Sequence, residues 1–141
     1  MEGKAFLNTA RKLVQMRDEA ALRSAVSRAY YAAYNCCIHL ARQLGFHFGN
    51  AAATHERIYL YLRNSGIEEA QAMAVDLKEL RKRRNEADYD MSSTKFQNHV
   101  ECQWDLVHAQ SIISQIEKYQ HEPLRTQLAA GLRDYEIKLK P

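Results

Sequence analysis

The chain has 141 residues, a usual length for a single domain that buries its own core without disulfides or metals. Its formal net charge of +3 permits contact with phosphates but does not require it. The three cysteines are an odd number, which argues against a disulfide framework and is typical of the reducing cytosol. No apolar run approaches the about 18 residues that span a bilayer, and no signal-peptide apolar region is found at the N-terminus. We therefore expect a cytoplasmic protein that does not span a membrane.

Apolar residues recur at helical spacing along most of the chain, which contains only five Gly and two Pro. This spacing predicts six helices, at about residues 4–17, 19–44, 55–63, 67–89, 94–120 and 124–138. Asp18 and Thr54 are expected to cap the second and third helices, and Ser92, Ser93 or Thr94 the fifth. The predicted fold is all-α, an antiparallel bundle of five to six helices. Residues 1–141 form one domain, with a core at about 4–120 and a last helix that packs on the bundle or on a second subunit.

The second predicted helix combines small and aromatic residues. Ala29, Ala32 and Ala33 leave little bulk on one stripe, so a neighbouring helix can approach closely. Tyr30 and Tyr31 stand beside this stripe, and their hydroxyls need partners if the rings are buried. This helix is therefore expected to lie in the centre of the bundle.

The fifth predicted helix carries apolar residues on two sides. One side is formed by Val100, Trp104 and Val107, and the other includes Leu106, Ile113 and Ile116. Such a distribution predicts that the helix is buried over much of its circumference.

In the fourth predicted helix, charged residues continue an apolar stripe on the same face of the helix. Its apolar stripe continues from Leu77 and Leu80 to Arg84 and Asp88, which lie within about 20° of Leu77 around the helix axis. Side chains that would belong to a core are replaced by an arginine and an aspartate. The pattern fits either a functional site or a solvated helix end closed by an Arg–Asp pair.

No metal site or cofactor is predicted. Cys36 and Cys37 are adjacent and therefore point to different faces of a helix, and together with His39 they lack the spacing of metal ligands. The sequence contains no glycine-rich phosphate loop and no nucleophile elbow.

Two segments occur in order and carry a family resemblance. The second helix reads Ser27-Arg-Ala-Tyr-Tyr-Ala-Ala33, and the fourth helix ends Arg84-Asn-Glu-Ala-Asp-Tyr89, before a turn and another long helix. Together they resemble the HEPN domain, named for higher eukaryotes and prokaryotes nucleotide-binding. The similarity is greatest to a prokaryotic branch with an Arg-x-x-Ala-Asp-Tyr type sequence, and it covers about residues 4–120.

The resemblance implies a helical homodimer whose motif helices face each other and bind a nucleotide or RNA. It also implies a component of a two-gene toxin–antitoxin or defence module with a minimal nucleotidyltransferase as partner. Many members are metal-independent ribonucleases, which would make Arg84 and Asp88 the catalytic residues. The residues that the resemblance assigns to nucleotide or RNA binding are Arg28, Tyr31, Arg83, Asn85 and Tyr89.

The chain departs from the family motif, which places a histidine a few residues after an arginine and a polar residue. Arg84 and Asn85 supply the first two, but Asp88 and Tyr89 stand where the histidine is expected, and Arg83 fits the spacing as well. Histidine exchanges protons near neutral pH because its pKa is about 6.5, whereas an exposed aspartate has a pKa of about 3.9. Three hypotheses follow: a binding module, a ribonuclease without the motif histidine, and a helical adaptor without catalytic activity.

Overall fold

The computed structural model describes residues 1–49 and 52–141, which fold into six α-helices and one 3₁₀ turn. The helices are α1 (Lys4–Met16), α2 (Glu19–Gln43), α3 (Thr54–Arg63), α4 (Glu68–Tyr89), the 3₁₀ turn η1 (Lys95–Gln97), α5 (His99–Lys118) and α6 (Leu124–Leu139). No β-strand occurs within the described residues. The predicted all-α fold is confirmed, and the predicted helix ends agree to within a few residues except for α5.

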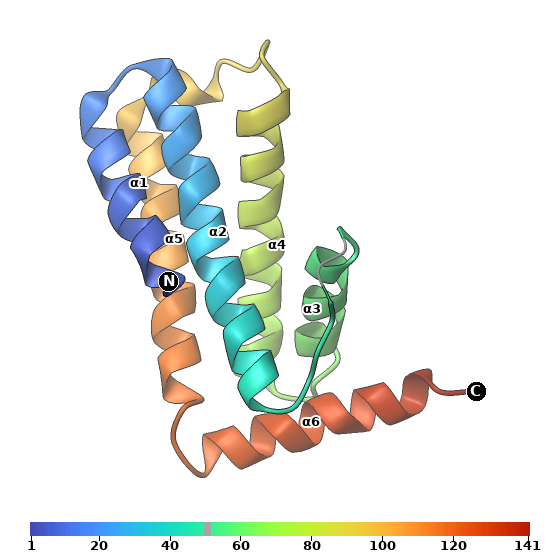
Figure 1. The fold of residues 1–141 in the computed structure, drawn as a ribbon. Helices are drawn as coiled ribbons and strands as arrows, with labels where there is room; N and C mark the ends of the chain where they lie inside the picture. The colour runs from blue at the N-terminus through green and yellow to red at the C-terminus, as the bar shows by residue number, and fades with distance from the viewer. Residues whose placement is uncertain (50–51) are drawn as a thin grey trace.

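Four helices, α1, α2, α4 and α5, run antiparallel and form the core of the bundle (Figure 1). Helix α2 lies in the middle and packs on α1, α4 and α5. The small residues predicted to allow close approach, Ala29, Ala32 and Ala33, are fully buried. Helix α3 packs beside α4, and α6 crosses the lower end of the bundle. Among the described residues, no helix is both long and apolar enough to cross a membrane.

One of the predicted helix caps is confirmed and two are wrong. The side chain of Asp18 accepts a hydrogen bond from the backbone N–H of Ala21 at 2.9 Å, as an N-cap should. Thr54 is instead the first residue of α3, and its buried hydroxyl donates to the carbonyls of the preceding loop. Helix α5 is capped by Asn98, because the fully buried Phe96 holds the preceding residues in the separate turn η1.

The predicted burial of α5 is correct for one side only. Leu106, Ile113 and Ile116 are buried, but Val100, Trp104 and Val107 are 50%, 59% and 51% exposed. The reason is that α1, α2 and α4 all pack on the same side of α5, so the opposite side meets solvent.

The last helix packs on the end of the bundle. Leu128 and Leu132 are buried, and the hydroxyl of Tyr61 on α3 donates to Glu136 on α6 at 3.0 Å. Gly131 marks the closest approach, because a Cβ atom at this position would lie 2.2 Å from the carbonyl oxygen of Ser65. Any larger residue there would push α6 away from the turn that joins α3 to α4.

Candidate functional site: an arginine cluster between α2 and α4

The side chain of Arg84 leaves α4 toward α2 and is largely buried. Its guanidinium donates hydrogen bonds to the hydroxyl of Tyr31 and, at 2.8 Å, to Oδ1 of Asn85. Nε lies 3.0 Å from Oδ2 of Asp88, but its hydrogen has no acceptor among the residues that the structure describes, so this contact is an ion pair without a hydrogen bond. Arg84 therefore uses two of its five N–H donors on neutral acceptors.

Asp88 joins the two helices. Its Oδ2 accepts a hydrogen bond from the hydroxyl of Ser27 on α2 at 3.0 Å, and its side chain is 27% exposed. The charged end of the apolar stripe on α4 thus meets polar groups of α2, namely Ser27 and Tyr31. Arg84 and Asp88, which the sequence places on one stripe, do lie together, one turn apart.

Arg28 adds a second guanidinium to the same place. It lies over the ring of Tyr31, 5.0 Å from the centroid, while Arg84 lies 4.9 Å from that centroid. Arg28 also covers the ring of Phe6 at 5.4 Å and has no carboxylate partner among the described residues. Two cations therefore share one aromatic ring, which attracts both through its negative face. We call Ser27, Arg28, Tyr31, Arg84 and Asp88 the Arg84 cluster.

Tyr89 borders the Arg84 cluster at the end of α4. Its ring is 73% exposed, with its centroid 5.7 Å from the guanidinium carbon of Arg84. Six of the seven predicted site residues thus lie in or beside one cluster: Arg28, Tyr31, Arg84, Asn85, Asp88 and Tyr89.

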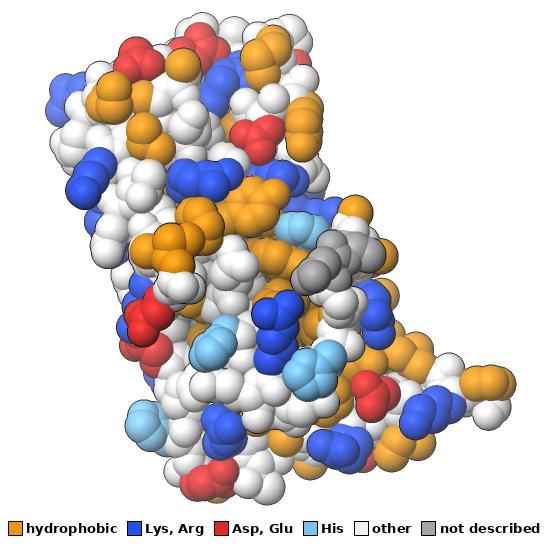
Figure 2. Space-filling model, in the orientation of Figure 1, with side chains coloured by type: hydrophobic (Ala, Val, Ile, Leu, Met, Phe, Trp, Pro, Cys, Tyr) orange, Lys and Arg blue, Asp and Glu red, His pale blue; other side chains and the backbone are white. Residues whose placement is uncertain are grey.

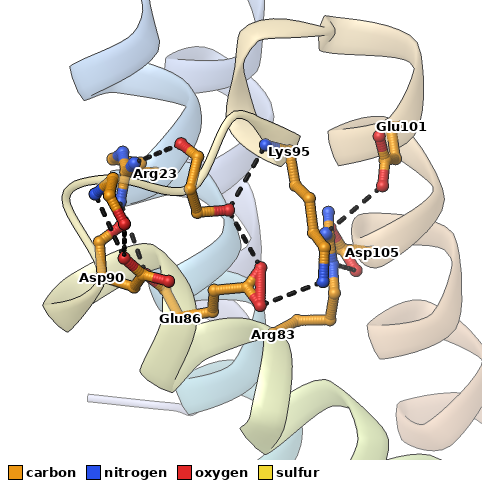
Figure 3. A network of polar contacts seen from close by, with 9 residues as sticks. Arg23, Arg83, Glu86, Asp90, Lys95, Glu101 and Asp105 are labelled. Carbon is orange, nitrogen blue, oxygen red and sulfur yellow. Dashed lines mark hydrogen bonds and ion pairs between the residues drawn. The ribbon is translucent and has the colours of Figure 1, made fainter.

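The seventh, Arg83, points to the opposite side of α4. It holds Asp105 on α5 with hydrogen bonds of 3.0 Å from Nε and 2.7 Å from Nη2, and its guanidinium lies 3.4 Å from Glu101 (Figure 3). Asp105 is only 5% exposed, and burial raises the pKa of this carboxyl although Arg83 opposes the shift. Of the two motif registers that the sequence leaves open, only that of Arg84 brings the arginine to Asp88.

A buried arginine for which the sequence predicts no role stabilises the end of α4. Arg23 on α2 is 8% exposed and donates at 2.9 Å to each of the carbonyls of Ala87, Asp90 and Ser93. Figure 3 shows Arg23 beside Asp90. Helix α4 ends without a glycine cap, so its last carbonyls need donors from elsewhere. The missing glycine is a sequence signal for such a donor, but it does not say which residue supplies it.

Histidine enters the site from a part of the chain remote from the motif. His55, in the first turn of α3, stacks on Tyr34 with ring centroids 4.0 Å apart and lies 6.2 Å from the centroid of Tyr31. Its Nδ1 is 2.5 Å from the hydroxyl of Tyr30. Burial, with Arg81 and Arg84 nearby, lowers the pKa of His55 to about 4, so the ring is neutral at pH 7. No local sequence pattern links His55 to the motif, because α3 reaches the site only through the fold.

A groove of about 800 Å³ starts beside the Arg84 cluster and runs along α2. We call it the α2 groove; its walls include Phe6, Tyr34, His39, Arg42, His55 and Glu117. On this face of the molecule, apolar and basic side chains lie side by side over α1, α2 and α4, next to a histidine (Figure 2). Phe6 and His55 line the groove and also contact the cluster, through Arg28 and Tyr31 respectively, so the groove and the cluster are adjacent.

The described residues contain no group of three or more His, Cys, Asp or Glu placed to hold a metal ion. Comparisons with protein-family models, with curated proteins and with solved structures gave no match.

Proposed function

We propose that this chain is a HEPN-like domain that binds the phosphate of a nucleotide or of RNA at the Arg84 cluster. The observation that carries the proposal is the charge of the cluster. Arg28 and Arg84 share the ring of Tyr31, while Asp88, the only carboxylate in the cluster, also accepts a hydrogen bond from Ser27. A partly open site with excess guanidinium charge favours an anion whose oxygens accept paired hydrogen bonds, as phosphate does.

Aromatic rings around the cluster favour a nucleotide over a simple anion. The exposed ring of Tyr89 lies on one side of Arg84, and Tyr34 and His55 lie toward the α2 groove. Base–aromatic stacking stabilises single-stranded nucleic acids on such surfaces without requiring a particular sequence.

The oligomeric state and partner in the proposal rest on the family resemblance. We propose a homodimer in which the α4 ends face each other, consistent with the exposure of Tyr89 and Met91 there. A minimal nucleotidyltransferase is the proposed partner in a toxin–antitoxin or defence module. Sedimentation of the purified chain tests the first point, and a monomer at micromolar concentration would contradict it.

The binding site is tested by fluorescence anisotropy with a 5′-fluorescein-labelled single-stranded RNA of twelve uridines. Arg84→Ala is expected to weaken binding about tenfold or more, because a charged donor to phosphate is lost. Lys82→Ala is the matched control, since it removes the same charge from an exposed position of the same helix and is expected to change affinity less than about threefold. Equal losses in both variants, or unchanged binding after Arg84→Ala combined with Asp88→Ala, would contradict the site.

The runner-up function is a metal-independent ribonuclease. It is favoured by a proton acceptor, Asp88, and a hydroxyl, that of Tyr31, on either side of the Arg84 guanidinium. In this reaction the RNA 2′-oxygen attacks the phosphorus and gives its proton to Asp88. The 5′-oxygen then leaves with a proton from a tyrosine hydroxyl, Tyr31 or Tyr89, and a 2′,3′-cyclic phosphate remains.

Incubation of total RNA and tRNA with the protein in EDTA separates these functions. Cleavage that ends in 2′,3′-cyclic phosphates and is lost in Arg84→Ala and Asp88→Ala would establish the ribonuclease. Binding without cleavage supports the binding module. If the protein neither binds nor cleaves RNA and yet dimerises, the Arg84–Asp88 pair closes an interface in a helical adaptor.

A further inference from the structure

Three nearly parallel rings, those of Tyr30, Tyr34 and His55, lie together beside the Arg84 cluster. Tyr34 stacks face to face on His55, with ring planes 13° apart. The buried ring of Tyr30 contacts both, with its centroid 5.8 Å from that of Tyr34 and 5.7 Å from that of His55, whereas His55 and Tyr34 line the groove. The stack therefore fixes the plane of the imidazole at the point where the cluster meets the groove.

The partner of Tyr30 decides which nitrogen of His55 carries the proton. Tyr30 is 1% exposed, and its hydroxyl has one hydrogen-bond partner among the described residues, Nδ1 of His55. A buried hydroxyl needs an acceptor for its hydrogen, and burial raises the pKa of Tyr30, which keeps that hydrogen in place. The hydroxyl therefore donates to Nδ1, and the proton of a neutral imidazole is on Nε2.

Burial keeps the ring of His55 neutral, and the nearby charges act in the same direction. Arg81 and Arg84 on α4 further disfavour a positive imidazolium. Glu56, next to His55 on α3, is exposed and lies 3.7 Å from Arg81. The Nε atoms of Arg81 and Arg84 are buried and have no acceptor within the described part of the chain. Nε2–H of His55 is thus a neutral donor in a positive region, without a partner among the described residues, and it suits an anionic oxygen.

A second guanidinium lies at the far end of the α2 groove. Arg42 is exposed, lines the groove and forms no ion pair among the described residues, whereas Lys4 at the same groove is paired with Glu117. Arg28 and Arg42 are fourteen residues apart on the same face of α2, which corresponds to about 21 Å along the helix axis. One phosphate or one mononucleotide does not span that distance, but an extended strand does.

We propose that the α2 groove binds the nucleotides that continue from the phosphate at the Arg84 cluster, with His55 Nε2–H donating to the first oxygen beyond it and Arg42 contacting a later phosphate. The ligand class is therefore single-stranded RNA of several nucleotides, not a free nucleotide. This inference rests on the proposed phosphate site at Arg84 and extends it. His55 acts in it as a hydrogen-bond donor to the ligand, not as a base, because its Nδ1 is occupied by Tyr30.

Two probes separate the inference from the function on which it rests: fluorescein-labelled octauridine and uridine 5′-monophosphate, whose binding is measured by anisotropy and calorimetry. His55→Phe keeps a ring on Tyr34 and removes the donor, and Arg42→Ala removes the far guanidinium. Each is expected to weaken octauridine binding about five- to tenfold and to leave binding of the monophosphate within about twofold. His108→Ala, at an exposed position of α5 that does not line the groove, is the control and is expected to leave binding of both probes unchanged.

Arg84→Ala is expected to weaken binding of both probes. If it weakens both while His55→Phe and Arg42→Ala change neither, the groove inference is wrong and the phosphate site stands. If Arg84→Ala has no effect on either probe, the proposed function itself fails.

Nitrogen-15 NMR of the unmodified protein tests the tautomer without any substitution that endangers folding. At pH 7 the His55 ring is expected to carry its proton on Nε2, and the Nε2 resonance is expected to shift when octauridine is added. A proton on Nδ1, or an Nε2 resonance that does not shift at saturating octauridine, would overturn the proposed role of His55. In Tyr30→Phe the preference for the Nε2 proton is expected to weaken, because the hydroxyl that donates to Nδ1 is gone.

Discussion

Arg83 and Arg84 are neighbours in the chain, and they face opposite sides of α4. On the α5 side, Arg83 meets two carboxylates, and the buried one, Asp105, receives hydrogen bonds from two of its nitrogens. On the α2 side, Arg84 shares an aromatic ring with Arg28 and donates to neutral groups. Both sides carry charged groups, but among the described residues the arginines of the α2 side outnumber their carboxylate partners, and these arginines lie next to a groove. Unmatched charge, more than charge itself, is what distinguishes the α2 side as the candidate site.

The largest expected effect on stability is on the α5 side of α4, where carboxylates match the charge of Arg83. Arg83→Ala leaves the buried carboxylate of Asp105 without its partner, which we expect to lower the free energy of unfolding by about 3 kcal/mol. Urea unfolding measures it. RNA binding by the folded fraction is expected to stay within about twofold. A loss of affinity as large as that of Arg84→Ala would remove the distinction between the two sides.

The next largest effect concerns Arg23, which connects α2 to the end of α4. Arg23→Ala removes the donor to the last carbonyls of α4 and is expected to lower the free energy of unfolding by about 2 kcal/mol. Hydrogen exchange of the amides at residues 86–90 should accelerate more than that of the first turns of α4. Uniform acceleration along the helix would show that Arg23 acts on global stability and not on this end.

A smaller effect depends on pH. The pKa of His55 is about 4 in the folded chain and about 6.5 when unfolded, so between these values the unfolded state binds more protons. Stability should therefore decrease as the pH falls from about 6.5 to about 4, by on the order of 1 kcal/mol after allowance for partial exposure of the ring. His55→Phe is expected to remove this contribution. Urea unfolding at pH 5 and pH 7 provides the comparison.

The smallest expected change in stability, that of Arg84→Ala, gives the clearest test of the difference between Arg83 and Arg84. Arg84→Ala breaks a partly exposed i,i+4 pair, and we expect the free energy of unfolding to change by only about 0.5 kcal/mol. A variant that loses RNA binding and keeps its stability would identify Arg84 as a binding residue. Destabilisation as large as that of Arg83→Ala would instead make it part of the framework.

The all-α fold and the proximity of some candidate site residues could be predicted from the sequence, because both depend on periodicity along single helices. Arg84 and Asp88 continue an apolar stripe, and helical geometry alone places them one turn apart. Arg23 and His55 were not predicted as site residues, because their partners lie on other helices. For the same reason the sequence does not decide whether Arg83 or Arg84 is the motif arginine. Adjacent residues on a helix point to different sides, and the sequence does not say which helix lies on each side. The exposed side of α5 was missed because apolar spacing does not tell how many helices pack against it.

The bonds from Arg23 to the carbonyls at the end of α4 also bear on the kinetics of encounter. They join the two helices that carry the cluster and so restrain the distance between these helices before any ligand arrives. Under the proposed function, association with a strand of RNA is expected to require no opening step, so that diffusion and attraction to the guanidinium groups determine its rate. In stopped-flow mixing, the rate of capture should rise linearly with RNA concentration without reaching a plateau. The same rate should fall as salt screens the field.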